Sequence, residues 1–188
     1  MFDRVAAQPA LENARPDVAT LQRQVVASRG WEGDNMIEKL EQALASAFPP
    51  IMIDRAMLDE PTANWDAYED YVDLVAFEGK TWRDLAPELL YKHSMLPVFA
   101  GDALWRATLP SYLWYVLHER ALFNDLPFQL ASQLTRKNDP DSHPRFDRRI
   151  APFSPAQRAT IRDVLSFLAT VSPLEETMSR ALATWNNL

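Results

Sequence analysis

Residues 109–117 read Leu-Pro-Ser-Tyr-Leu-Trp-Tyr-Val-Leu, an apolar stretch whose single polar side chain is Ser111. We expect it to form a buried central helix over about 109–121. Pro110 suits the first helical position, where its missing N–H leaves no bond unmade. A helix that is apolar on every side must be covered by other elements. The predicted fold is therefore all-α, a compact multi-helix domain built around this helix.

The composition limits the class of protein. The chain has 188 residues, 47% of them hydrophobic and 24% charged, which suits one globular domain with a real core. Cysteine is absent, which excludes a disulfide framework, a thiolate metal site and a cysteine nucleophile. The absence of cysteine favours a cytoplasmic location for the protein, and a periplasmic location stays possible. No apolar run has the length of a signal-peptide core or a membrane span, so we expect no membrane association.

The order of elements follows from apolar spacing and helix signals. We expect residues 1–16 to form a flexible N-terminal lead-in and residues 17–188 to form a single helical domain. Residues 51–53 could form a short strand, but no other segment shows the apolar alternation of a strand that could pair with it. We therefore interpret 51–53 as a buried connector. Apolar spacing predicts helices over 17–29, ended by Gly30; from Asp34 or Asn35 to Phe48, with a stripe of Ile37, Leu40, Leu44 and Phe48; over 66–77; and over 126–134.

Capping signals place several helix starts. Ser154-Pro155-Ala156-Gln157 and Ser172-Pro173-Leu174-Glu175 each combine a cap, a first-position proline and the reciprocal side chain of a capping box. Thr81 with Asp84 predicts a further box, after which Pro87 either kinks the helix or starts a new one. Asp102 after Gly101 is interpreted as the cap of a short helix before the central one.

Residues 136–153 show no period and contain three prolines, which predicts one long loop. Its charges are mixed, with five basic and three acidic residues. The loop either covers the acidic segment described next or joins a binding surface, and we favour the intramolecular contact because it needs no partner.

Negative charge is concentrated in residues 54–78. This segment holds eight acids and one arginine, so its net charge of −7 equals that of the whole chain. An acidic protein is a poor direct ligand for nucleic acid, which requires a basic surface, and a good one for a basic protein. Within the segment, helical spacing places four acids on one face, Asp66, Glu69, Asp70 and Asp73, opposite Tyr68, Tyr71, Val72 and Val75.

Three interpretations of this face stay open. It is a solvated surface that aids solubility, a docking surface for a basic partner, or, least favoured, a divalent-metal site. In the docking interpretation the partner-binding residues are the four acids together with the aromatic anchors, Trp65 and Tyr68.

The sequence holds no recognisable catalytic motif. His93, His118 and His143 stand in no ligand spacing, and four glycines provide no phosphate-binding loop. We therefore expect a protein that is not an enzyme, with no catalytic residue, no metal and no cofactor. The alternative is an enzyme or small-ligand-binding protein with a pocket among the helices near Trp105, Tyr112 and His118, and an adaptor with an exposed apolar patch is a third possibility.

An ordered set of motifs resembles an uncharacterised family of small bacterial all-helical proteins over about residues 37–170. The motifs are Trp82-x-x-Leu85, Leu96-Pro-Val-Phe99, Gly101-Asp-Ala-Leu104, Leu109-Pro110-x-Tyr112-Leu113 and Phe153-Ser-x-x-Gln157. The resemblance implies a compact helical domain, of a kind that often occurs beside interbacterial toxins as the immunity partner. With the acidic segment, it predicts an immunity protein that neutralises a cognate basic toxin by covering its active surface.

Overall fold

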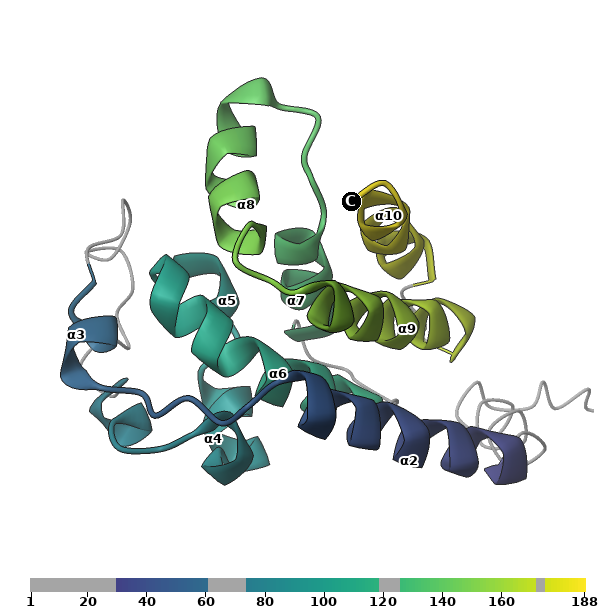
Figure 1. The fold of residues 1–188 in the computed structure, drawn as a ribbon, viewed down its shortest axis with the longest axis horizontal. Helices are drawn as coiled ribbons and strands as arrows, with labels where there is room; N and C mark the ends of the chain where they lie inside the picture. Colours follow the sequence, from purple (N-terminus) through teal and green to yellow (C-terminus); the bar gives the residue numbers. More distant parts are fainter. Residues whose placement is uncertain (1–29, 61–73, 119–125, 172–174) are drawn as a thin grey trace, which may run out of the picture. The chain divides into compact units, whose positions relative to one another are not determined.

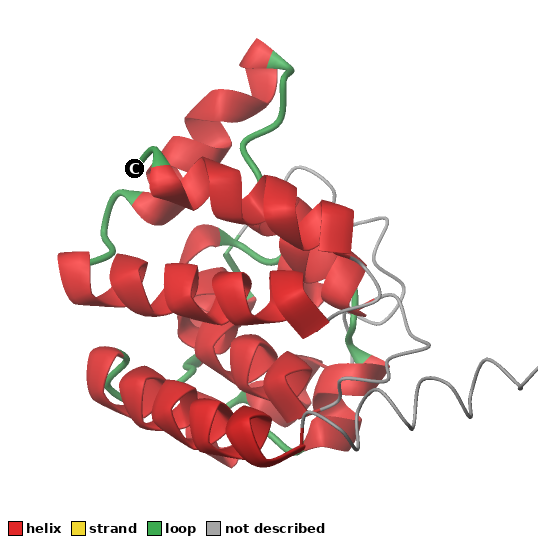
Figure 2. Ribbon diagram, turned by 90° about the vertical axis from the view of Figure 1, so that its right-hand side faces the viewer, coloured by secondary structure: helices red, strands yellow, loops and turns green. Residues whose placement is uncertain are grey.

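The computed structural model describes residues 30–60, 74–118, 126–171 and 175–188. Every regular element in these ranges is a helix and none is a strand (Figure 2), which confirms the all-α fold class. The chain divides into two compact units, Met1–Met36 and Ile37–Leu188, and the central helix belongs to the second. The predicted lead-in 1–16 and the predicted helix 17–29 lie outside the described residues.

The central helix, α6, spans Asp102–His118 and is buried along most of its length. The prediction of a buried central helix is confirmed, but its predicted start was wrong. Pro110 lies inside the helix, and Asp102 is its first residue, not the cap of an earlier one. The predicted end at 121 lies outside the described residues.

A proline inside a helix leaves the carbonyl four residues earlier, here that of Arg106, without its amide donor. Two hydroxyls nearby bond to other carbonyls of the same helix: Thr108 Oγ1 donates to Leu104 O at 2.9 Å, and Ser111 Oγ donates to Thr108 O at 2.6 Å. The polar residue of this apolar stretch is thereby satisfied within the helix, and the packing around α6 outweighs the local cost of the proline.

Shorter and longer helices of the second unit pack on α6 (Figure 1). Elements that precede α6 in the sequence and elements that follow it both contact α6. The last helix, α10, packs on α9 and α7. The elements are α2 (Gly30–Ala47), α3 (Arg55–Leu58), η3 (Trp82–Asp84), α4 (Pro87–Lys92), α5 (Leu96–Phe99), α7 (Leu126–Leu134), η4 (Pro140–Ser142), α8 (His143–Ile150), α9 (Pro155–Val171) and α10 (Glu175–Asn186).

Helix α2 confirms the predicted apolar stripe, because Ile37, Leu40, Leu44 and Phe48 are all buried. Its predicted start was wrong: Gly30 is the first residue of α2, not the residue that ends an earlier helix. On its opposite, polar face, Glu41 is partly buried while Glu38, Lys39 and Gln42 are exposed.

The connector 51–53 is buried only at Ile53. Ile51 and Met52 are 46% and 64% exposed, so their predicted burial was wrong. Ile53 is held by two backbone hydrogen bonds of 2.8 Å, from its N–H to Lys80 O and from Gly79 N–H to its carbonyl. Gly79 reaches this position with a φ of 73°, a conformation that glycine adopts without strain.

Of the predicted helix 66–77, the structure describes only residues 74–77, which form a short 3₁₀ turn. Leu74 and Phe77 are buried, whereas Val75, predicted on the apolar face, is 51% exposed. A 3₁₀ turn repeats every three residues, so positions 74 and 77 share the inner side and 75 turns outward. The face assignment of Val75 was therefore wrong.

Two capping predictions are confirmed. The carboxylate of Asp84 accepts hydrogen bonds from the backbone N–H and the hydroxyl of Thr81, at 2.9 and 2.7 Å, and a new helix starts at Pro87. Ser154 and Gln157 exchange hydrogen bonds of 2.9 and 3.2 Å at the start of α9. The other predicted start, at Ser172, lies outside the described residues.

The predicted loop 136–153 was the largest error. It contains η4 and the helix α8, in which Phe146, Arg149 and Ile150 form the buried side. These positions have the spacing of one helical face, but an arginine takes one of them and hides the apolar stripe. The acidic residues that this segment was expected to contact, over 66–73, lie outside the described residues. The described partners of Arg148 and Arg149 include Asp102.

Candidate functional site

The six partner-binding residues predicted from the sequence fall outside the described residues. The structure therefore places none of them relative to the others. They are Trp65, Asp66, Tyr68, Glu69, Asp70 and Asp73.

The four remaining acids of segment 54–78 have partners inside the fold. Asp54 Oδ1 accepts from Met57 N at 2.9 Å as the N-cap of α3. Arg55 lies 3.1 Å from Asp59 and 3.9 Å from Glu78. Glu60 reaches the start of the central helix. A docking surface made by this segment would therefore rely on the four acids over 66–73.

Glu60 caps the central helix from a distance in the sequence. Its Oε2 accepts a hydrogen bond from the backbone N–H of Ala103 at 2.9 Å. A carboxylate is favourable there because the first N–H groups of a helix lack partners and carry partial positive charge. The carboxylate fits because residue 101 is glycine: a Cβ at Gly101 would overlap it.

Gly101→Ala is expected to displace Glu60 from the helix end and to lower the free energy of unfolding by about 1 kcal/mol, the usual value of a lost cap. Urea denaturation measures it. In a Glu60→Ala background the same alanine should cost much less, because no carboxylate remains to be displaced. An equal cost in both backgrounds would show that the two residues are not coupled.

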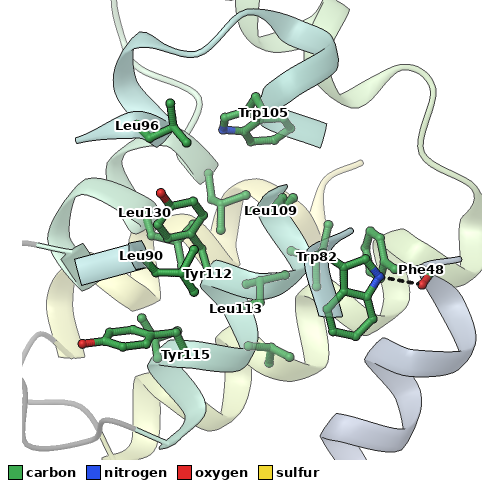
Figure 3. Packing of buried hydrophobic residues seen from close by; sticks show 14 of the residues in the cluster. Phe48, Trp82, Leu90, Leu96, Trp105, Leu109, Tyr112, Leu113, Tyr115 and Leu130 are labelled. Carbon is green, nitrogen blue, oxygen red and sulfur yellow. Dashed lines mark hydrogen bonds between the residues drawn. The ribbon is translucent and has the colours of Figure 1, made fainter. Parts of the chain in front are cut away.

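A pocket of about 140 Å³ opens beside the central helix. Its wall is largely apolar, and the indole N–H of Trp82 is already bonded to Phe48 O at 3.0 Å (Figure 3). The volume is close to that of cavities of about 150 Å³ that bind benzene. The lining residues are Phe48, Pro49, Ile51, Trp82, Arg106, Ala107, Pro110, Pro152, Phe153 and Gln157.

Two of the described lining residues have polar side chains, Arg106 and Gln157. Arg106 is partly buried, and its guanidinium has no hydrogen bond or ion pair with any residue that the structure describes. Gln157 uses its Oε1 to accept from Ser154 N, which leaves its NH₂ group as a donor. Both groups offer N–H donors, and one of them carries a positive charge.

The sequence reasoning missed Arg106, and it named Gln157 only as a capping residue and as the last residue of the Phe153-Ser-x-x-Gln157 motif. One signal for Arg106 was present: it is the only charged residue between Leu104 and Leu117. The predicted alternative pocket lay near Trp105, Tyr112 and His118. Trp105 and Tyr112 are instead core residues, each 1% exposed, and none of the three lines the pocket described above.

A second polar cluster joins α2 to the end of α6. Oε1 of Glu41 lies 2.7 Å from both Trp114 Nε1 and His118 Nε2, and the rings of Trp114 and His118 are 4.2 Å apart between centroids. The contact explains why Glu41 is partly buried on an otherwise wet helix face. It fastens two helices together and does not belong to the pocket lining.

The other two histidines have separate surroundings. His93 is buried edge-on against Phe77, and its carbonyl accepts from the hydroxyl of Tyr112. His143 Nε2 lies 2.7 Å from Lys137 O. Within the described ranges, no group of three or more histidine, aspartate or glutamate side chains is arranged to hold a metal ion.

No family model, curated protein or solved structure matches this chain. The family resemblance drawn from its motifs stays a prediction. In the part of the chain that the structure describes, no helix has the length and apolar character that crossing a bilayer requires.

Proposed function

We propose that this protein is a protein-binding module of the immunity type, which neutralises a cognate basic toxin by covering its active surface. The observation that carries the proposal is the charge distribution. Residues 54–78 hold a net charge of −7, and the rest of the chain is balanced. Such a concentration speeds encounter with a basic partner and orients it.

The described flanks of the acidic segment support this proposal. On one side, Leu58 is buried and Glu60 holds the start of α6. On the other side, Leu74 and Phe77 are buried in the core. The four acids thus belong to a segment attached to the body at both ends. Val75, two residues after Asp73, adds exposed apolar surface, which a partner-binding surface requires beside its charges.

The test is binding of the purified protein to the product of the neighbouring gene, by calorimetry at two salt concentrations. Charge reversal of Asp66, Glu69, Asp70 and Asp73 to lysine is expected to weaken binding at low salt at least tenfold and to flatten its salt dependence.

A matched control separates the local surface from net charge. Lysine at Glu38, Glu88, Asp141 and Asp163, four exposed acids elsewhere, changes the net charge by the same amount. We expect the control to bind within about threefold of the wild-type protein at low salt. Equal loss in both variants, or no loss in the first, would remove the acidic segment from the binding surface.

A further inference from the structure

We propose that the pocket beside α6 is a binding site for a small monocarboxylate that carries one aromatic ring, with phenylacetate as the simplest member of the class. The proposal is independent of the protein-binding function above, because it uses a different surface and different residues.

The size and wall of the pocket select the apolar part of this ligand. Phe48, Trp82 and Phe153 are buried residues that supply aromatic surface, and Pro110 belongs to the central helix. A volume of about 140 Å³ accommodates one ring and is well below the roughly 300 Å³ at which drug-sized sites begin. The pocket thus favours a ligand with a single aromatic ring and a short substituent.

The polar groups select a carboxylate. Arg106 contributes a positive charge and several N–H donors, and Gln157 contributes its NH₂ group. Among the lining residues that the structure describes there is no carboxylate side chain, so none of them neutralises Arg106. A carboxylate that accepts from both side chains would satisfy the guanidinium in a partly apolar site, where charge-assisted hydrogen bonds are strongest.

The start of α9 adds to this selection. The helix begins at Pro155 and runs for 17 residues, and Pro152, Phe153 and Gln157 near its start all line the pocket. The N-terminal end of a helix carries partial positive charge, which favours an anion nearby. Arg106 of α6 and the first turn of α9, which includes Gln157, therefore both favour an anion.

The experiment is a titration of the ¹⁵N-labelled protein with phenylacetate, followed by amide chemical shifts. We expect saturable shifts centred on the pocket-lining residues, with half-saturation near millimolar concentrations, the range for so small a ligand. Phenylacetamide, which keeps the shape and lacks the charge, should bind at least tenfold more weakly. Absence of shifts at 10 mM phenylacetate, or equal binding of acid and amide, would overturn the proposal.

Two variants locate the charge. Arg106→Met keeps the apolar stem of the side chain and should lower the affinity for phenylacetate at least tenfold while leaving that for the amide unchanged. Arg162→Met, on α9 outside the lining, makes the same change of net charge and should bind phenylacetate as the wild type does. Equal affinities of the two variants would overturn the role of Arg106. The comparison of acid with amide on the wild-type protein stands even if Arg106→Met fails to fold.

Discussion

Arg149→Met is expected to lower the free energy of unfolding by about 3 to 5 kcal/mol, the cost of breaking a buried charged network by removing one partner. Arg149 is 2% exposed and lies over the ring of Trp105, with its guanidinium carbon 5.1 Å from the ring centroid. Burial, with Arg145 nearby, lowers its pKa to about 10, so the side chain is still charged at neutral pH.

The cost is large because one guanidinium satisfies several groups at once. It donates to Asp102 at 3.1 Å, to Gln133 Oε1 at 3.1 Å and to Pro97 O at 3.2 Å, and it also bonds Ala100 O. Pro97 is the second residue of α5 and Ala100 is its C-cap, and a helix of four residues is too short to satisfy these carbonyls itself. Methionine fills much of the space but donates no hydrogen bond. Among the described residues, Asp102 then keeps only Arg148 and Ala100 O keeps only a longer bond from Arg145, while Pro97 O and Gln133 Oε1 lose the donor that Arg149 supplied.

Arg148→Met is the matched control, because Arg148 pairs with the same carboxylate but is 65% exposed. An exposed pair contributes about 0 to 1 kcal/mol. Urea denaturation at pH 7 measures both variants. Similar losses for the two arginines would mean that burial is not the source of the effect.

The same ion pair sets a direction for acid stability. Burial raises the pKa of Asp102, but hydrogen bonds from Arg148 and Arg149 outweigh it and hold the pKa below its usual value. A lowered folded-state pKa contributes stability above the unfolded value of about 3.9, which is lost as the pH falls through the folded value. In Asp102→Asn that part of the acid-induced loss of stability should disappear.

Trp185→Ala is expected to cost about 3 to 5 kcal/mol, the range for removing a buried tryptophan side chain. Trp185 is 1% exposed, and its indole N–H donates to Leu134 O, at the end of α7, at 2.8 Å. Its ring lies 6.2 Å from that of Phe153. One side chain thus fastens the last helix to two other parts of the core.

Trp185→Phe separates the two contributions. Phenylalanine keeps most of the apolar contact and loses the hydrogen bond, so the expected cost is smaller, about 1 to 3 kcal/mol. Thermal or urea unfolding of the purified variants gives both values. If Trp185→Ala stayed within 1 kcal/mol of the wild type, α10 would not belong to the cooperative core.

Much of the fold could be predicted because its signals are local. A capping box joins residues three apart, as in Thr81 with Asp84 and Ser154 with Gln157, and both boxes formed as predicted. The stripe of α2 needs only the helical period. The errors arose where a distant contact outweighed a local rule, as when Pro110 was placed at a helix start because a proline inside a helix is locally unfavourable.

The candidate sites divide in the same way. The acidic segment is a property of composition, so the sequence alone reveals it. The pocket was not, because its lining runs from Phe48 to Gln157 and no pattern in the sequence relates these positions. The charge of Arg106 in the otherwise uncharged stretch from Leu104 to Leu117 was the nearest signal, but it does not indicate what the side chain faces.

The amino-acid sequence by itself determined the all-helical class, the buried character of α6, two capped helix starts and the localisation of negative charge, since each depends on residue type and short spacing. Only the tertiary structure decided that Arg149 of α8 is buried, that Glu60 caps α6 and that Arg106 lines an apolar pocket. Each of these depends on chain segments more than 40 residues apart. Such contacts stabilise the protein only once the core has brought the segments together, so local sequence preferences do not predict them.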